Sequence, residues 1–214
     1  MKKRHVNLVL IGPPGCGKGT QAERICEKFG LTYVSTGNLI REEIQANSAI
    51  GIKAKELSAQ GHFLDDATVL SLVQKKLQSS HNGVLFDGFP RTLTQAHAIE
   101  SLIPIHAVLD IQVSEEEVIK RISSRFMVEL NHEQHTFTSK SEAETYVKKN
   151  GGHVFQREDD KPNVVKERLK VYHTMTEPLI SFYGKKHLLY IVNGEKSIEN
   201  VWADIQKVIN KKLQ

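Results

Sequence analysis

The chain has 214 residues, of which 39% are apolar and 25% charged, and its 29 Lys and Arg against 25 Asp and Glu give a formal net charge of +4. This length and apolar content allow a buried core in one or two compact units and argue against a disordered protein. No apolar run approaches the roughly 20 residues of a membrane-spanning helix, the basic runs are scattered, and only two cysteines occur, Cys16 and Cys26. We therefore expect a soluble, cytoplasmic protein without disulfides that binds neither membranes nor nucleic acid.

Short apolar runs alternate with longer amphipathic stretches along the chain. The apolar runs predict buried strands at 8–11, 33–35, 84–86, 107–113 and 188–192. The amphipathic stretches predict helices at 19–29, 38–46, 67–78, 94–101, 115–126, 163–183 and 198–212. This alternation is typical of an α/β fold, in which helices cover both faces of a parallel sheet. Residues 37–66 and the polar residues 126–158 interrupt it, and excursions of that length are often lids or binding flaps.

A glycine-rich loop follows the first predicted strand directly and opens a helix. Its residues 12–20 read Gly-Pro-Pro-Gly-Cys-Gly-Lys-Gly-Thr. Strand, glycine loop and helix together point backbone N–H groups at an anion, and Lys18 then reaches the β- and γ-phosphates of a nucleotide. The loop predicts a fold of the P-loop NTPase type with a parallel five-stranded sheet. Such loops usually carry Ser or Thr directly after the lysine, and its hydroxyl holds Mg²⁺. Here Gly19 occupies that position, and the hydroxyl of Thr20 follows one residue later.

A second loop follows the third predicted strand and carries Asp87 and Arg91. A carboxylate at the carboxyl end of a strand beside a P-loop strand is placed to hold Mg²⁺ through water. Open α/β sheets bind ligands in the crevice at this edge, where Arg91 would also point. An Asp-Gly pair taken alone is equally typical of a simple turn.

Arginines recur at the ends of predicted elements. Arg121 and Arg125 are four residues apart and should share one face of the predicted helix 115–126, although Arg121 could equally form a surface pair with Glu117. Arginine forks match phosphate geometry, so the set suits a site that handles several phosphates. Its other members are Arg41, Arg91, Arg157 and Arg168.

Three ordered stretches resemble signatures of the adenylate kinases and related nucleoside monophosphate kinases. They are the loop 12–20, residues 35–41 (Ser-Thr-Gly-Asn-Leu-Ile-Arg) and residues 87–95 (Asp-Gly-Phe-Pro-Arg-Thr-Leu-Thr-Gln). The resemblance covers nearly the whole chain. It implies a core made of 1–34, 66–125 and 159–214, an AMP-binding flap at 35–65 and a lid at 126–158. It also implies a monomer that catalyses ATP + AMP = 2 ADP reversibly with Mg²⁺ and needs no protein base, because the acceptor is itself a phosphate.

The same resemblance assigns site residues position by position. It implies that ATP binds at Gly15, Cys16, Gly17, Lys18, Gly19, Thr20, Arg121, Arg125, Phe137 and Lys196. It implies that AMP binds at Thr36, Arg41, His62, Phe63, Leu64, Gly88, Phe89, Pro90, Arg91, Gln95, Arg157 and Arg168. Lys18, Arg91, Arg125, Arg157 and Arg168 would be catalytic, and Asp87 would hold Mg²⁺ through water.

The chain departs from the family pattern mainly in the lid. Residues 131–137 stand where the family usually has a Gly-Arg-x-x-His stretch, and Asn38 stands where it has an aspartate. Three histidines in this region, His132, His135 and His153, suggest a metal site as a minor hypothesis. A UMP/CMP kinase and a P-loop nucleotide-hydrolysing switch remain as alternatives. Thr36 and Gln95 favour AMP over UMP or CMP, and Gly19 argues against the switch.

Overall fold

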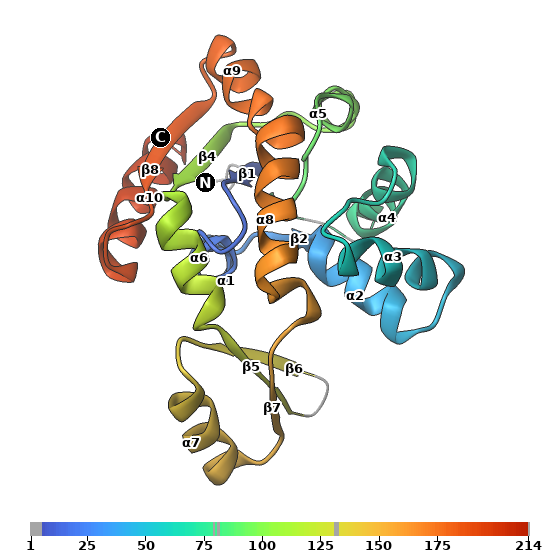
Figure 1. Cartoon of the computed structure of the whole chain (residues 1–214). Helices are drawn as coiled ribbons and strands as arrows, with labels where there is room; N and C mark the ends of the chain where they lie inside the picture. Colours follow the sequence, from blue (N-terminus) through green and yellow to red (C-terminus); the bar gives the residue numbers. More distant parts are fainter. Residues whose placement is uncertain (1–5, 79, 81, 131–132, 214) are drawn as a thin grey trace.

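Five parallel strands form the centre of the molecule in the computed structural model, which describes residues 6–78, 80, 82–130 and 133–213. Their order in the sheet is β2-β3-β1-β4-β8 (Figure 1). The strands are β1 (Leu8–Ile11), β2 (Thr32–Ser35), β3 (Val84–Asp87), β4 (Ala107–Gln112) and β8 (Leu189–Asn193). The strand predictions and the α/β fold class are therefore confirmed. Because all five strands run the same way, their carboxyl ends meet at one edge.

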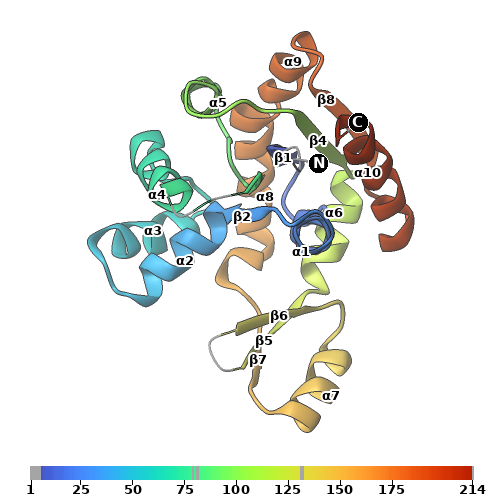
Figure 2. The ribbon, with the colours of Figure 1, turned by 180° about the vertical axis from the view of Figure 1, so that it is seen from behind.

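Helices cover both faces of this sheet, because successive residues of a strand point to opposite sides. Leu8 and Leu10 of β1 pack with one apolar cluster, whereas Val9 and Ile11 pack with another. The first cluster is completed by α1 (Lys18–Phe29) and α10 (Ile198–Leu213), which Figure 2 shows from behind. The second is completed mainly by α4 (Asp66–Gln78), α5 (Leu93–Glu100) and α9 (Pro178–Lys185). In the described part of the chain, no helix is both long and apolar enough to cross a membrane.

The first excursion is a helical hairpin that extends from the end of β2. Ser35 caps α2 (Thr36–Gln45) by accepting a hydrogen bond from the Asn38 N–H, and Ser48 caps α3 (Ala49–Ala59) in the same way through Gly51. The two helices pack very closely at Gly51, where an added Cβ would lie 2.0 Å from the carbonyl oxygen of Glu43. The hairpin therefore depends on a glycine at this position.

The second excursion contains strands that the sequence pattern did not predict. It comprises β5 (Phe126–Leu130), β6 (Glu133–Phe137), α7 (Lys140–Asn150) and β7 (His153–Phe155), and its antiparallel strand order is β6-β5-β7. Polar residues dominate β6, so it lacks the apolar alternation by which strands are recognised. The segment projects from the ends of α6 (Glu115–Ser123) and α8 (Pro162–Val171), away from the sheet (Figure 1).

Two helix predictions need correction. The predicted helix 115–126 ends at Ser123, so Arg125 lies beyond it. The predicted helix 163–183 is divided into α8, a π-helical turn (Tyr172–Thr176) and α9. In that turn the Glu177 N–H bonds to the Tyr172 carbonyl five residues back, and Pro178 then opens α9 because it has no N–H to donate.

Candidate active site

The glycine loop lies at the carboxyl edge of the sheet, between β1 and α1. Gly12 and Gly15 have φ of 146° and 76°, and a Cβ at Gly12 would lie 2.5 Å from the Ile111 carbonyl oxygen. The ammonium of Lys18 is held over the loop by the carbonyl oxygens of Gly12 (2.7 Å) and Pro13 (2.8 Å). The N-terminus of α1, with Gly19 and Thr20 in its first turn, points at the same place. This arrangement presents N–H groups and a cation to an anion.

Cys16 contributes backbone to this loop, whereas its thiol is packed inside. Its side chain is buried in the cluster beneath α1. Burial raises the pKa of the Cys16 thiol, even though Lys18 lies 3.4 Å away and acts in the opposite direction. The thiol is therefore neutral and does not act as a nucleophile at ordinary pH.

Asp87 ends β3 beside the loop and accepts a 2.7 Å hydrogen bond from the Tyr33 hydroxyl of β2. Burial, followed by the charge of Asp87, raises the pKa of Tyr33. Among the described residues, no three His, Cys, Asp or Glu side chains come together as a metal cage. Mg²⁺ usually binds one or two carboxylates, waters and substrate phosphates, so the position of Asp87 beside a phosphate loop fits this ion.

The predicted monophosphate residues converge around the carbonyl of Gly88. The hydroxyl of Thr36 donates to this oxygen at 2.7 Å, and Nε of Arg91 donates to it at 2.8 Å. The guanidinium of Arg91 lies over the ring of Phe63, 4.6 Å from its centroid. Gly88 has a φ of 71°, and a Cβ there would approach Arg91 to 2.7 Å. A glycine is therefore required where Thr36 and Arg91 meet.

Gln95 lies in the first turn of α5 with 2% of its surface exposed. Its amide oxygen accepts from the Arg91 N–H at 2.8 Å, and its amide nitrogen donates to Asp66 Oδ1 at 2.7 Å. Asp66 Oδ2 also accepts from the hydroxyl of Thr92, which caps α5. Sequence reasoning missed Asp66, although it follows the predicted AMP-binding residues 62–64 almost directly.

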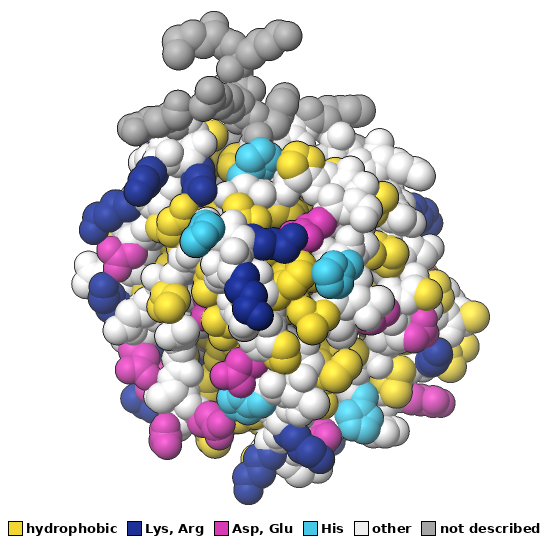
Figure 3. Space-filling view, turned by 90° about the horizontal axis from the view of Figure 1, so that it is seen from above, with side chains coloured by type: hydrophobic (Ala, Val, Ile, Leu, Met, Phe, Trp, Pro, Cys, Tyr) yellow, Lys and Arg dark blue, Asp and Glu magenta, His cyan; other side chains and the backbone are white. Residues whose placement is uncertain are grey.

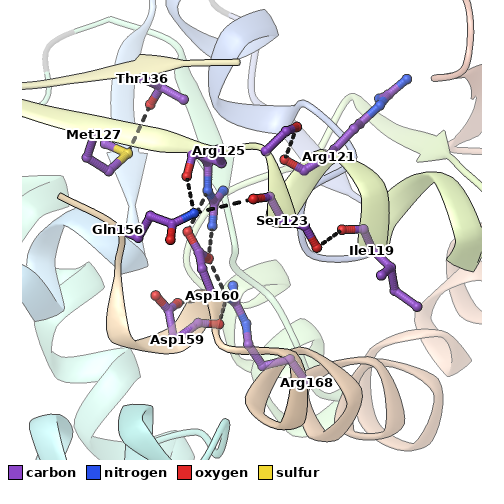
Figure 4. A network of polar contacts seen from close by, with 11 residues as sticks. Ile119, Arg121, Ser123, Arg125, Met127, Thr136, Gln156, Asp159, Asp160 and Arg168 are labelled. Carbon is purple, nitrogen blue, oxygen red and sulfur yellow. Dashed lines mark hydrogen bonds and ion pairs between the residues drawn. The ribbon is translucent and has the colours of Figure 1, made fainter. Parts of the chain in front are cut away.

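Arg125, just after α6, and Arg168 of α8 form a cluster with Asp159 and Asp160 (Figure 4). Nε of Arg125 donates to Asp160 Oδ2 at 2.9 Å, and the side chain of Asp160 is only 2% exposed. Arg168 pairs with Asp159 at 2.7 Å. Because Arg125 lies beyond α6, it does not share a helical face with Arg121, and that prediction is wrong. Asp159 and Asp160 were also missed, although they follow Arg157 closely in the sequence.

Positive charge exceeds negative charge in this cluster. Nε of Arg157 is buried without a hydrogen-bond partner in the structure. Burial, followed by the neighbouring Arg41, lowers the pKa of Arg157 to about 10. Burial, followed by Arg168, lowers the pKa of Arg91 to about 10 as well. These arginines therefore lie close enough to repel one another, and an anion with several charges would relieve the repulsion.

Arg121 joins the loop to the segment after β8. It donates to the carbonyls of Cys16 (3.4 Å) and Gly194 (2.9 Å) and pairs with Glu117 at 2.8 Å, so the alternative of a Glu117 pair is confirmed. The side chain of Lys196 is paired with Asp204 at 2.7 Å. This leaves the backbone of 194–196 as the part of the segment that adjoins the loop.

The remaining predicted residues lie in less direct positions. Phe137 packs on Tyr146 of α7, with 5.1 Å between ring centroids, and so belongs to the internal packing of residues 126–158. His62 lies 3.4 Å from Glu167 of α8. Leu64, Phe89 and Pro90 are buried. His135 and His153 contact Tyr146 and Phe155 and form no metal cluster in the described chain, and His132 lies outside the described residues.

Comparison with known proteins gives one consistent result. A family model described as adenylate kinase matches residues 10–188. The chain is 41% identical to an adenylate kinase of Archaeoglobus fulgidus, 37% to one of Methanosarcina barkeri and 39% to one of Lactobacillus johnsonii. Each match covers 96% of this chain and 99% of the relative.

Proposed function

The chain belongs to the adenylate kinase family, so it is a phosphotransferase whose acceptor is a phosphate group and whose substrates are nucleotides; we propose that it uses Mg²⁺ and the site residues described above. The observation that carries this proposal is the grouping of Lys18 and five arginines, Arg41, Arg91, Arg125, Arg157 and Arg168, at one end of the sheet. Such a grouping is costly without a ligand of high negative charge. Two nucleotides that meet phosphate to phosphate supply that charge.

The acceptor needs no protein base in this mechanism. The second pKa of a phosphate monoester is about 6, so AMP is largely a dianion near neutral pH. The task of the protein is to neutralise crowded anions, align them and exclude water. Lys18 and the N–H groups of residues 15–20 would hold the donor phosphates. Arg41 and Arg91 would hold the acceptor phosphate, with Thr36, Gly88 and residues 62–64 around its nucleoside and Gln95 at its base.

Arg125, Arg157 and Arg168 would contact the phosphoryl group while it is transferred from donor to acceptor. Arg125 uses only part of its fork on Asp160, and Arg168 only part of its fork on Asp159, so each keeps N–H groups for phosphate oxygens. Arg157, with its unpartnered Nε, would bridge donor and acceptor. When bound, Mg²⁺ would neutralise charge on the donor phosphates, and Asp87 would hold it through water. Arg121, Phe137 and the backbone at Lys196 would border the donor nucleotide.

We also propose that 35–65 acts as a flap and 126–158 as a lid over the core formed by 1–34, 66–125 and 159–214. Both segments stand out from the sheet in Figure 1. The flap begins at the carboxyl end of β2, where Thr36 bonds to the carbonyl of Gly88, and the lid begins directly after Arg125. Closure of the two would exclude water from the phosphates.

A monomer in the cytoplasm is the proposed working form. The free cysteines Cys16 and Cys26 fit a reducing compartment. Basic, acidic and histidine side chains are interspersed over the face seen in Figure 3, unlike the single-sign faces of nucleic-acid binders. Light scattering after gel filtration would test the monomer.

The function is tested by the products formed from Mg-ATP with AMP, CMP, UMP, GMP or no acceptor, separated by chromatography. We expect ADP from AMP alone, and ATP and AMP from ADP in reverse. Turnover with CMP or UMP would make the chain a UMP/CMP kinase. Phosphate release without any acceptor effect would make it a nucleotide-hydrolysing switch.

A further inference from the structure

We propose that Asp66 is a specificity-determining positioning residue: it fixes the orientation of the Gln95 amide so that the acceptor site takes adenine and rejects hypoxanthine. The inference rests on the proposed function, in which Gln95 reads the base of AMP. Asp66 itself would not touch the nucleotide. It would act through the amide to which it is bonded.

The two partners of Gln95 leave only one orientation for its amide. Asp66 presents a carboxylate, which only accepts hydrogen bonds, at 2.7 Å from one end. The backbone N–H of Arg91, which only donates, lies 2.8 Å from the other end. The nitrogen must therefore face Asp66 and the oxygen must face Arg91. A Gln amide that lacked these partners could rotate by 180° about its last torsion at little cost.

Asp66 is itself held firmly. Its second carboxylate oxygen accepts from Thr92 at 2.9 Å, and the same hydroxyl accepts from the Gln95 N–H at 3.1 Å. Asp66 begins α4 and Thr92 caps α5, so the network joins the starts of two helices that pack on the same face of the sheet. Thr176 continues it on the other side by donating to the Arg91 carbonyl at 3.0 Å.

The fixed orientation matches one purine edge and opposes the other. After these contacts, the amide keeps one N–H and one oxygen lone pair for a ligand. Adenine offers an acceptor at N1 and a donor at its 6-amino group, which complement that pair. Hypoxanthine offers a donor at N1 and an acceptor at O6, which is the reverse. With hypoxanthine bound, the amide N–H would face the N1 donor and the amide oxygen would face the O6 acceptor. Buried mismatches of this kind strongly disfavour the wrong base.

The test compares AMP with IMP as acceptors in wild-type protein and Asp66→Asn. Asparagine keeps the shape of aspartate but can turn either its oxygen or its nitrogen toward Gln95. We expect kcat/KM for AMP relative to IMP to fall about tenfold, mainly through a higher KM for AMP with kcat changed less than about twofold. Affinities measured by calorimetry should change in the same way as KM: AMP should bind more weakly, and its advantage over IMP should shrink.

Asp65→Asn is the matched control, because it removes the same charge from the adjacent residue. Asp65 is exposed and caps α4 by accepting from the Thr68 N–H at 2.9 Å, a role that asparagine also fills. Its AMP to IMP ratio should equal that of wild type. A double-mutant cycle completes the test: in a Gln95→Leu background, Asp66→Asn should leave the ratio unchanged within about twofold.

Three outcomes would overturn the proposal: an unchanged AMP to IMP ratio in Asp66→Asn, an equal loss of AMP and IMP binding with lowered thermal stability, or the same change of ratio in the Gln95→Leu background. The first leaves Asp66 without influence on the base, the second makes it merely structural, and the third makes it independent of Gln95. Failure of the proposed function shows separately, as wild-type protein that prefers CMP or UMP to AMP.

Discussion

The hydroxyl of Tyr33 donates to Asp87 Oδ2 at 2.7 Å, across the neighbouring strands β2 and β3. The register of the two strands sets Ser35 opposite Asp87, and Tyr33 lies two residues earlier on the same face. The bond occupies one carboxylate oxygen and fixes the plane of the group, so the other oxygen is aimed by the protein before any metal or water arrives.

Tyr33→Phe removes this bond and keeps the ring. We expect the Mg²⁺ concentration for half-maximal turnover to rise severalfold, because Asp87 would no longer be oriented. The free energy of unfolding should fall by about 1 kcal/mol, the usual contribution of one hydrogen bond. Magnesium titrations of activity and of ATP binding would measure the first effect, and urea denaturation the second. Tyr190→Phe, on β8 beside Lys212, is the control and should leave the titration unchanged.

Arg91→Ala should abolish most turnover without unfolding the protein. We expect kcat to fall by at least about a hundredfold, since Arg91 would neutralise the acceptor phosphate. Loss of the contacts with Phe63 and Gly88 is offset by relief of repulsion from Arg168 and Arg41, so stability should change by about 1 kcal/mol or less. Steady-state kinetics and thermal unfolding would measure both.

Arg24→Ala is the control for Arg91. Arg24 forms an exposed pair with Glu199 and lies outside the site, so both turnover and stability should stay near wild type. Wild-type turnover in Arg91→Ala would remove Arg91 from the proposed mechanism.

Asp160→Asn should destabilise the fold strongly. The carboxylate is buried and faces both Arg125 and Arg168, so its removal leaves buried cations without their counter-charge. We expect a loss of about 3 kcal/mol, typical of a broken buried ion pair, by urea denaturation. Added sulfate should restore part of it by supplying an anion to the cluster. Glu158→Gln, in the same turn but 75% exposed and paired with Lys161, should change stability by less than about 0.5 kcal/mol. Equal losses in the two variants would contradict the expected role of burial.

The strands, the loop and most helices were predictable because their signals are local. The run 8–11 is apolar enough to be buried on both faces, and the glycines at 12 and 15 occur where φ is positive. Strand β6 was missed because its pairing with β5 is held by backbone bonds in a polar stretch, with no apolar alternation to reveal it. The break at Tyr172–Thr176 was missed because a single π-helical turn is too short to interrupt the apolar pattern of a long helical stretch, even though Pro178 marks where α9 begins.

The candidate site divides in the same way. Lys18, Asp87 and Arg91 follow directly from motifs at strand ends, and the structure places them at one edge of the sheet. Tyr33 and Asp66 are side chains whose importance lies in what they contact across the fold, 54 and 29 residues away in sequence. A single sequence carries no signal for such contacts, so they emerge only when the strands and helices are packed.

His173 should make stability depend on pH. It hydrogen-bonds Glu177 at 2.8 Å and Glu115 at 2.9 Å, which joins the π-helical turn to the start of α6. These bonds, that to Glu177 first, raise the pKa of His173 above its ordinary value of about 6.5. The lysines Lys166 and Lys170 line the same hollow as His173.

The sign follows from proton linkage. Because the folded pKa exceeds the unfolded one, the protonated imidazole stabilises the fold fully below about pH 6.5, and this contribution disappears as pH rises through the folded pKa. His173 is 42% exposed, so solvent screening limits the effect to less than about 1 kcal/mol. We expect His173→Gln to lose stability against wild type at pH 5.5 and to match it at pH 9, in urea denaturation at both values. His153→Gln, at the exposed first position of β7, should show no such difference between the two pH values. A deficit in His173→Gln that is equal at both would mean that the imidazole acts through packing and not through its charge.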